Sequence, residues 1–447
     1  MLLHNLHYIQ LMKQRLINIL FWSVISAAFI GPGTVTTAAS AGAEFGYALI
    51  WALIFSTAAC YVLQEASARI TAVSGMNLGE AMRSEYGSSQ WGKWIIGLAL
   101  IAIVSGCAAF EAGNILGAVA GISLINSSLP VPVIVLAIGL IAILLLWKGT
   151  VQQIAKLLGV IVAIMGACFL ITAFLIPHDY STLFSDGFTP SIPPGAEILV
   201  LGLIGTTVVP YNIFLGSGLK HAQSPSEMKL SLGIAIGLGG VISIAILLTG
   251  TAITGSFSFE ELASTLSGQL GGYGQWLLGI GLFGAGISSS LTAALAASIT
   301  AKSLLATGVD GQKWSESGPR FRSVWIGVVG IGMLFGVMEL QPIPVIILAQ
   351  ALNGIILPVI AVILFLLMNN SRVLPRNHQN GPFMNLITGV VVYLTILIGL
   401  TNLLRALSGA VGFKLPDQYV ITAVSVFIFL IVIIPVIKKM VHNEVQI

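Results

Sequence analysis

Runs of about 20 apolar residues recur along the chain, and each is long enough to cross the hydrocarbon core of a bilayer as a helix. Hydrocarbon offers no water to bond peptide groups, so membrane-spanning segments must be helices or closed barrels. The sequence predicts an all-α integral membrane protein with twelve spanning helices at 17–43, 47–72, 94–119, 131–147, 152–176, 196–219, 230–254, 274–300, 323–339, 342–369, 383–407 and 418–440.

The composition also places the chain among membrane proteins. Apolar residues make up 56% of the sequence and charged residues 8%, and the mean hydropathy is +0.99. Soluble globular proteins carry about 25% charged residues, so these values exclude that class. The formal net charge of +3 reflects residues in the loops beside the spans. We therefore expect a lipid bilayer around the chain and no nucleic-acid partner.

Lys and Arg are concentrated in every second loop between the predicted spans. The basic residues on that side are Lys13, Arg15, Arg83, Lys93, Lys148, Lys156, Lys220, Lys229, Lys313, Arg320, Arg322, Arg372, Arg376, Lys438 and Lys439. The loops on the other side hold Asp179, Asp186, Glu260 and Glu261, with Arg405 and Lys414 as the basic exceptions. Because basic loops stay in the cytoplasm, this pattern predicts a multi-pass protein of a prokaryotic plasma (inner) membrane with both termini cytoplasmic.

Two of the predicted spans contain residues that break a helix. Gly31-Pro32-Gly33-Thr34 lies within the first span, and residues 205–212, Gly-Thr-Thr-Val-Val-Pro-Tyr-Asn, lie within the sixth. Proline removes an amide donor and clashes with the preceding turn, and glycine weakens a helix further. Paired interruptions at corresponding places in two halves are typical of the central site of a secondary transporter. A proline kink without a ligand is the alternative interpretation of the first break.

The residues at and beside the two breaks are the candidate substrate-binding residues. Half-helices that begin near Thr34 and Tyr211 would point free amide donors, and the positive ends of their dipoles, into a cavity. Hydroxyl and carboxamide side chains at the breaks add further hydrogen-bonding groups. The candidate set is Gly31, Gly33, Thr34, Thr36, Thr206, Thr207, Val209, Tyr211 and Asn212.

Polar residues inside other spans are further candidates. Glu111 lies within the third span, where a carboxylate is costly unless it is protonated, paired or hydrated. A role in proton or ion coupling and a buried structural hydrogen bond are equally compatible with its position. Ser288 can line a path or bond back to its own helix. Gln350 and Asn353 lie one helical turn apart and can line a cavity or bridge helices.

Several other patterns have structural explanations, and none indicates an enzyme, a cofactor or a bound metal. Glu65 and Arg69 are spaced for a helical ion pair. Residues 279–284 have the Gly-x-Gly-x-x-Gly spacing of a dinucleotide fingerprint, but they lie inside a membrane run and follow no strand, which favours close helix packing. No nucleophile and base are paired for catalysis. The three cysteines form no Cys-x-x-Cys motif and are interpreted as small apolar residues: Cys60, Cys107 and Cys168.

These features together resemble the natural resistance-associated macrophage protein (NRAMP) family of proton-coupled divalent-metal transporters. The resemblance runs over spans one to ten and is carried by the two breaks, the end of the second span, and residues 41–47, 108–117, 286–292 and 348–358. It implies a leucine-transporter-like fold with two inverted five-helix repeats, in which spans one and six are unwound at mid-membrane. The implied repeats are residues 17–176 and 196–369, with two peripheral spans within 383–440.

The chain departs from the family pattern at its metal-binding positions. Gly31-Pro32-Gly33-Thr34 replaces the family's Asp-Pro-Gly-Asn, and Val209-Pro210-Tyr211 replaces its Met-Pro-His. Glu111 matches the first acidic residue of the family's pair in the third span, while Asn114 replaces the second. We therefore place Glu111 and Asn114 together as coupling-ion candidates. The family's second glutamine in the tenth span is replaced by Ile356.

These replacements bear directly on the expected substrate. A multivalent cation that leaves water normally recovers its hydration energy from carboxylate, imidazole or thiolate ligands, which the two breaks lack. We therefore expect a secondary transporter of a small anion, with bicarbonate as the first candidate and a coupled proton or sodium ion. A magnesium or manganese transporter that keeps part of the ion's water shell is the alternative, and a transport-inactive membrane sensor is another. The oligomeric state stays open, and a monomer is compatible with the sequence.

Overall fold

The computed structural model describes residues 30–149, 151–218, 225–307, 310–411, 415 and 417–444. Within these residues all regular structure is helical, and eleven segments are long and apolar enough to cross a membrane. They are α3 (Ile50–Ser74), α5 (Gln90–Ile125), α6 (Val131–Lys148), α7 (Val151–Leu175), α9 (Glu197–Thr207) together with α10 (Pro210–Gly218), α11 (Pro225–Gly250), α13 (Gly274–Leu305), α14 (Pro319–Val337), α15 (Pro342–Met368), α16 (Pro382–Val411) and α17 (Gln418–Glu444).

Each of these eleven segments coincides with one of the predicted spans, so that part of the prediction is confirmed. Of the predicted first span, residues 17–29 lie outside the described residues, and the remainder forms α2 (Pro32–Phe45). The helices α5 and α13 are longer than predicted, at 36 and 32 residues. Their ends project past the apolar stretch because a helix stops at its cap rather than at the edge of the hydrocarbon.

Among the residues that the structure describes, three short helices and the one-turn helix η2 (Arg376–His378) lie outside the spans and were not predicted. The helix α4 (Leu78–Tyr86) starts with a capping box between Asn77 and Glu80. The helices α8 (Tyr180–Gly187) and α12 (Phe259–Leu270) are capped by Asp179 and Ser258. Hydrogen bonds from Thr182 and Ser181 hold the pKa of Asp179 below its ordinary value. Side-chain caps at polar N-termini explain why such short helices form between spans.

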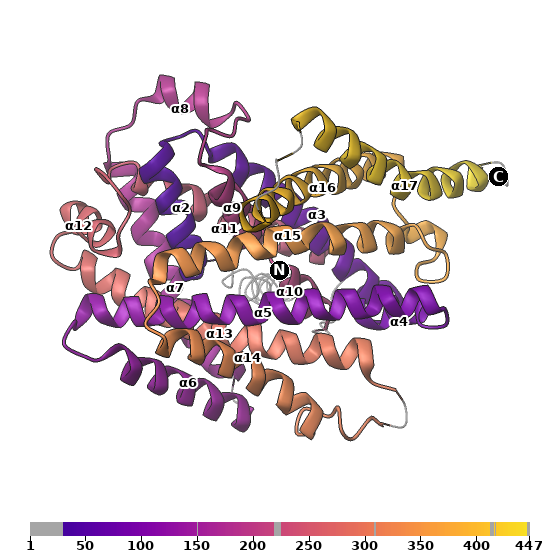
Figure 1. Cartoon of the computed structure of the whole chain (residues 1–447), viewed down its shortest axis with the longest axis horizontal. Coiled ribbons are helices and arrows are strands. Elements are labelled where there is room, and N and C mark those ends of the chain that lie inside the picture. Colours follow the sequence, from indigo (N-terminus) through magenta and orange to yellow (C-terminus); the bar gives the residue numbers. More distant parts are fainter. Residues whose placement is uncertain are drawn as a thin grey trace, which may run out of the picture.

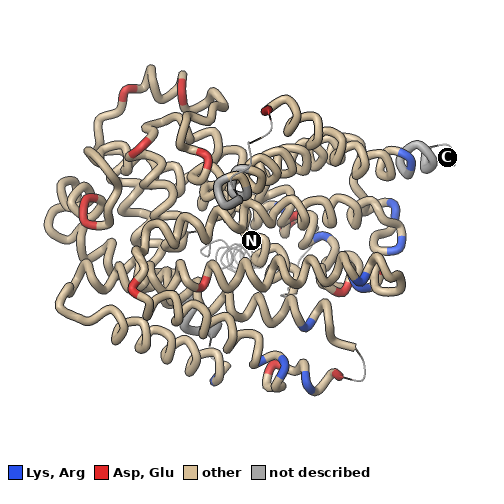
Figure 2. The backbone as a smooth tube through the Cα atoms, viewed as in Figure 1, with Lys and Arg blue, Asp and Glu red and all other residues tan. Residues whose placement is uncertain are grey.

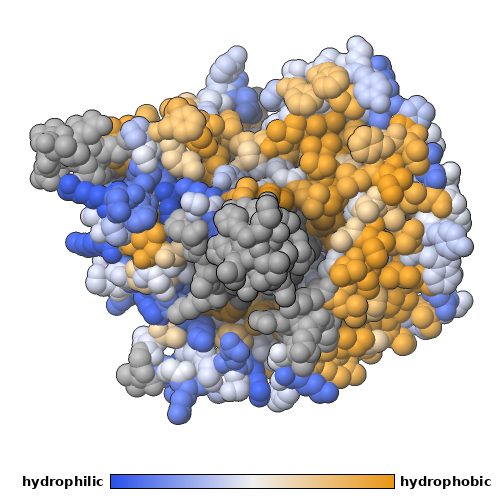
Figure 3. Space-filling model, turned by 180° about the vertical axis from the view of Figure 1, so that it is seen from behind, coloured by the Kyte–Doolittle hydropathy of each residue, from blue (hydrophilic) through white to orange (hydrophobic). Residues whose placement is uncertain are grey.

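The helices form one bundle in which α5, α13 and α15 run lengthwise across the view of Figure 1. Lys and Arg gather at the end of the bundle that holds α4 and the connection from α15 to α16, whereas the loops around α8 and α12 at the opposite end carry Asp and Glu (Figure 2). On the face seen in Figure 3, apolar residues cover much of the surface between the two ends. The distribution agrees with the predicted orientation, in which the basic end faces the cytoplasm.

Glycines allow α13 to pack closely against α5 and α7. A Cβ on Gly121 of α5 would lie 2.5 Å from the carbonyl oxygen of Gly279 in α13, and a Cβ on Gly279 would lie 2.7 Å from Ile125 Cγ1. A Cβ on Gly284 would lie 3.2 Å from Ile161 Cγ2. The predicted packing role of residues 279–284 is therefore confirmed, because small residues let helix backbones approach closely in a membrane.

The predicted ion pair at the end of the second span is present. Arg69 lies 3.1 Å from Glu65, and Lys229 of α11 approaches the other oxygen of the same carboxylate at 3.5 Å. Arg69 also donates to Asn380 Oδ1 at 2.6 Å and to the carbonyl oxygen of His378 at 3.2 Å. These contacts fasten α3 to α11 and to the connection between α15 and α16.

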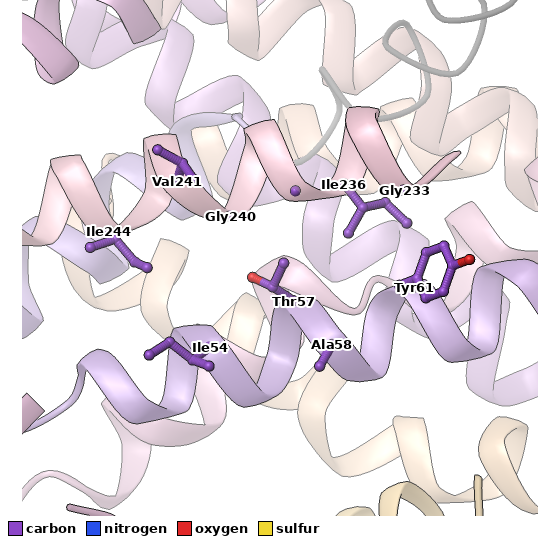
Figure 4. A pocket seen from close by; sticks show the side chains of 10 residues that line it. Ile54, Thr57, Ala58, Tyr61, Gly233, Ile236, Gly240, Val241 and Ile244 are labelled. Atoms are coloured by element: carbon purple, nitrogen blue, oxygen red, sulfur yellow. The ribbon is translucent and has the colours of Figure 1, made fainter. Parts of the chain in front are cut away.

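A shallow apolar groove of about 440 Å³ separates α3 from α11 on the outside of the bundle (Figure 4). Ile54, Thr57 and Tyr61 line its α3 side, while Ile236 and Val241 line the α11 side. Its walls carry very few polar groups, and more than half of the Val241 surface is exposed. The groove therefore faces the lipid and lies apart from the two helix breaks.

Candidate functional site

The first break lies where α2 begins. Gly31 is extended, with φ −94° and ψ 178°, and Pro32 is the first residue of the helix. Proline suits this position because its ring fixes φ near the helical value and its missing amide needs no partner. The helix thus starts two residues before Thr34, and no side chain caps it. The hydroxyl of Thr37 bonds back to the Gly33 carbonyl oxygen at 2.6 Å.

The second break separates α9 from α10. The helix α9 ends at Thr207, Val208 adopts φ −97° and ψ 76°, and α10 starts with Pro210. Val208 and Val209 therefore form the non-helical link, which falls within the predicted break at residues 205–212, and both are buried. Thr207 donates its hydroxyl to the Leu203 carbonyl oxygen at 2.8 Å, so this side chain serves its own helix.

The two breaks meet inside the bundle. The hydroxyl oxygens of Thr34 and Thr206 lie 2.8 Å apart, and both residues are buried. A Cβ on Gly33 would overlap the side-chain nitrogen of Gln350 in α15, and a Cβ on Gly205 would overlap the Gln350 carbonyl oxygen. Residues 145 to 317 positions apart in the chain thus come together. The structure unites Gly33, Thr34, Thr206 and Gln350 from the candidate set.

Several buried polar atoms near this junction have no hydrogen-bond partner among the described residues. They include both carboxamide atoms of Asn212, both carboxamide atoms of Gln350, and the hydroxyl of Thr36. Asn212 and Gln350 are completely buried. Buried polar groups in proteins are nearly always hydrogen-bonded. A concentration of unpartnered groups at the junction of two broken helices therefore indicates a site for a small polar or charged ligand.

Glu111 lies beside this junction on α5. It is fully buried and accepts a hydrogen bond from the Ser290 hydroxyl of α13. The ring of its neighbour Phe110 meets the Tyr211 ring edge-on, with centroids 5.2 Å apart. A Cβ on Gly332 of α14 would lie 2.6 Å from Glu111 Cγ. Glu111 therefore links three helices next to the start of α10.

The remaining candidates lie farther from the two breaks or have other partners. Asn353 donates to the Ala349 carbonyl oxygen at 3.3 Å, and a Cβ on Gly106 of α5 would lie 2.7 Å from its Oδ1. The hydrogen bond from Asn353 to Ala349 therefore stays within α15, and the Asn353 oxygen lies against α5, so both interpretations of this residue stay open. Ser288 is half-buried, and the serine that contacts Glu111 is Ser290. Asn114 is buried one turn along α5 from Glu111.

Ser290 was missed as a site residue because the run Ser288-Ser289-Ser290 gives no sign of which hydroxyl faces α5. Ser290 and Glu111 are 179 positions apart in the sequence, so no local sequence pattern indicates that they are in contact. Among the described residues, no group of three or more His, Cys, Asp or Glu side chains lies together in a way that could hold a metal ion. The junction instead offers hydroxyls, carboxamides and backbone groups, all of them neutral.

The sequence and the structure were compared with known proteins. A protein of Verminephrobacter eiseniae named divalent metal cation transporter MntH is 28% identical over 295 residues, which cover 62% of this chain and 66% of that protein. A protein of the same name from Pectobacterium carotovorum is 25% identical over 404 residues, covering 86% of this chain and 93% of that protein. The alignment with the first of these relatives leaves about a third of its length unmatched.

Solved structures share the fold. A manganese transporter of Eremococcus coleocola has a TM-score of 0.68 at 16% identity, with 97% of this chain and 95% of that chain covered. Mhp1, a nucleobase-cation-symport-1 family transporter, has a TM-score of 0.58 at 16% identity and covers 94% of this chain. The chain therefore has the leucine-transporter-like fold expected from its sequence.

The boundaries of the two inverted repeats stay a prediction. The profile of the family described as natural resistance-associated macrophage protein-like matches residues 23–405, which is most of the chain. The expected multi-pass arrangement in a bacterial plasma membrane holds as well. This chain belongs to the natural resistance-associated macrophage protein family of membrane transporters.

Proposed function

We propose that the chain is a secondary active transporter of a small inorganic ion, which binds where the breaks of α2 and of α9–α10 meet Gln350 of α15. The single observation that carries this proposal is the contact between Thr34 and Thr206 across the two breaks, surrounded by buried polar atoms without partners. Helix breaks at mid-membrane persist where they line a cavity. Membership of a transporter family supports the same conclusion.

A divalent metal cation is the substrate class that the relatives favour. The two bacterial relatives bear the name of divalent metal cation transporters, and none of these comparisons supports the anion expected from the sequence. The side-chain oxygens of Thr34, Thr206, Asn212 and Gln350 are hard, neutral ligands that suit magnesium or manganese. Neutral ligands do not replace a full hydration shell, so the cation keeps part of its water and binds weakly.

A small oxyanion, with bicarbonate first, is the second candidate because of one feature of the junction. A carboxamide can turn either its oxygen or its two N–H donors toward a ligand, and the two orientations have nearly the same shape. The first turns of α2 and α10 add amide donors and positive dipole ends. The break at Gly31 carries no carboxylate that would repel an anion.

Coupling to a second ion is assigned to Glu111. A carboxylate that is fully buried within a membrane span exchanges a proton or pairs with a cation rather than staying bare. Its hydrogen bond from Ser290 and its position one residue from Phe110, which packs on Tyr211, connect it to the start of α10. Asn114, one turn away, is the second member of this coupling group. A proton is the first candidate for the coupled ion and sodium the second.

Proteoliposomes containing the purified full-length protein test the proposal. Uptake of manganese, magnesium and bicarbonate is measured side by side, with empty liposomes as the control. Saturable uptake of the two cations with little discrimination between them is expected from a neutral, partly hydrated site. Bicarbonate uptake without cation uptake would select the second candidate. Absence of all three fluxes would contradict a transporter of these ions and favour a membrane sensor.

A further inference from the structure

Gln64 on α3 is a buried carboxamide outside the candidate set derived from the sequence. It is 1% exposed, and neither its nitrogen nor its oxygen has a hydrogen-bond partner among the described residues. A buried carboxamide without partners destabilises a folded protein. Such a group therefore calls for an explanation other than packing.

Two hydrogen bonds fix how α3 lies against α10. The hydroxyl of Ser67 donates to the Ile213 carbonyl oxygen at 2.8 Å, and the hydroxyl of Thr71 donates to the Ser217 carbonyl oxygen at 3.1 Å. Both pairs are separated by 146 positions. The two helices therefore run parallel and in step over this turn, because α-helices share the same rise per residue.

The same offset of 146 positions pairs Gln64 with Pro210, the first residue of α10. Gln64 precedes Thr71 by seven residues, which is about two helical turns, so both lie on the face of α3 that contacts α10. The next residue, Glu65, points elsewhere and pairs with Arg69 and with Lys229 of α11. Gln64 is thus at the level of the second break and on the side that faces it.

We propose that Gln64 is a third carboxamide of the ion site, together with Asn212 of α10 and Gln350 of α15. All three are buried, all three have two unpartnered side-chain atoms, and they come from three different helices. Gln64 contacts the transported inorganic ion or its remaining water shell, with its oxygen toward a cation or its N–H groups toward an oxyanion. This inference rests on the proposed function.

The substitution Gln64→Leu in the full-length protein tests this assignment, because leucine keeps much of the volume and removes both polar atoms. We expect kcat/KM for ion uptake into proteoliposomes to fall about tenfold or more, as for the loss of a hydrogen bond to a charged group. The Tm should stay unchanged or rise, since an unpartnered buried group is removed. If both the Tm and the rate of uptake fall in Gln64→Leu, Gln64 has a structural role and the proposal is overturned.

A matched control lies on the same helix. Ser56 is buried in α3 and bonds only to the Leu53 carbonyl oxygen of its own helix among the contacts described, so Ser56→Ala should leave uptake and Tm unchanged. If Gln64→Leu does not fold, Gln64→Glu provides a second test, because an added carboxylate at the site should tighten cation binding and weaken anion uptake. Unaltered affinity in that variant would overturn the proposal.

Variants of the other two carboxamides distinguish a failure of this inference from a failure of the proposed function. Loss of uptake in Asn212→Ala and Gln350→Ala with normal uptake in Gln64→Leu would remove Gln64 from the site and leave the site itself in place. Normal uptake in all three variants would place the ion elsewhere in the bundle. Loss in all three, with Tm retained in Gln64→Leu, is the result that the inference expects.

Discussion

The hydroxyl oxygens of Thr34 and Thr206 lie 2.8 Å apart and join the first turn of α2 to the last turn of α9. Each residue lies beside a break in its own helix, so this hydrogen bond ties the two breaks together across 172 positions of sequence. Any movement of α2 against α9 must stretch or exchange this bond. A hydroxyl pair can also turn its oxygens toward an ion, so the same two groups serve the structure and the ligand.

Replacing either hydroxyl tests this double role. Thr34→Val or Thr206→Val keeps the side-chain shape and should lower the free energy of unfolding by about 0.5–1.5 kcal/mol, as for the loss of one buried hydrogen bond. Ion uptake should fall in both variants. The loss of stability in the double variant should be smaller than the sum of the two single losses, because each hydroxyl is the other's partner. Thr249→Val is the matched control, since Thr249 is buried and bonds to the Ala245 carbonyl oxygen within α11.

Two glycines next to Gln350 should respond differently to the same added methyl group. In Gly33→Ala the new Cβ meets the end of the Gln350 side chain, which can swing away. We expect this variant to keep its fold but to lose uptake because a site carboxamide is displaced. In Gly205→Ala the new Cβ meets the Gln350 backbone, which should lower the free energy of unfolding by about 1–3 kcal/mol or more. Equal Tm values for the two variants would contradict this packing.

Glu111→Gln tests the coupling role. Glutamine keeps the side-chain shape and can still accept a hydrogen bond from Ser290, so the variant should fold with a Tm close to that of the wild type. Across the pH range over which wild-type uptake varies, uptake by the variant should stay constant, because the variant has no proton to exchange at this position. Uptake rates across that range provide the measurement, with Asp186→Asn in an exposed segment as the control. A pH profile identical to the wild type would make Glu111 a structural residue.

The ion pair of α3, which lies at the basic end of the bundle, should matter mainly for stability. The Glu65 side chain is 1% exposed, and Arg69 supplies its shorter ion contact. Arg69→Ala leaves Glu65 with the more distant Lys229 and also removes the bond to Asn380. Removing one member of a buried ion pair costs about 3–5 kcal/mol, and the 11% exposure of Arg69 places the expected loss at the lower end of that range. Thermal unfolding in detergent measures this loss, and Arg320→Ala, which breaks an exposed pair with Asp310, should have little effect.

The two breaks and the ion pair could be predicted from the sequence because their causes are local. Pro32 and Pro210 cannot continue a helix, and Glu65 and Arg69 are four residues apart on one. The exact start of α2 differed from the expected Thr34 because proline itself occupies the first helical position.

Contacts between helices could not be predicted in the same way. The helices α3, α9 and α15 are apolar on nearly all sides, so the pattern of the sequence does not show which face meets which neighbour. Gln64 and Ser290 were missed for this reason, since their roles depend on α10 and on Glu111. Asn353 and Gln350 lie one turn apart on α15, and the sequence gives no reason to treat them differently. In the structure, the Asn353 side chain faces Gly106 of α5, whereas Gln350 lies against Gly33 and Gly205 at the two breaks.

The most direct test of a neutral ion site at the junction is the affinity for manganese in Gly31→Asp, measured by uptake into proteoliposomes beside the wild type. Gly31 has φ −94° and ψ 178°, a conformation that aspartate adopts without strain. A carboxylate at the break should strengthen manganese binding at least tenfold and abolish any uptake of bicarbonate by repulsion. Manganese affinity and bicarbonate uptake that both equal those of the wild type would contradict the placement of the ion at this junction.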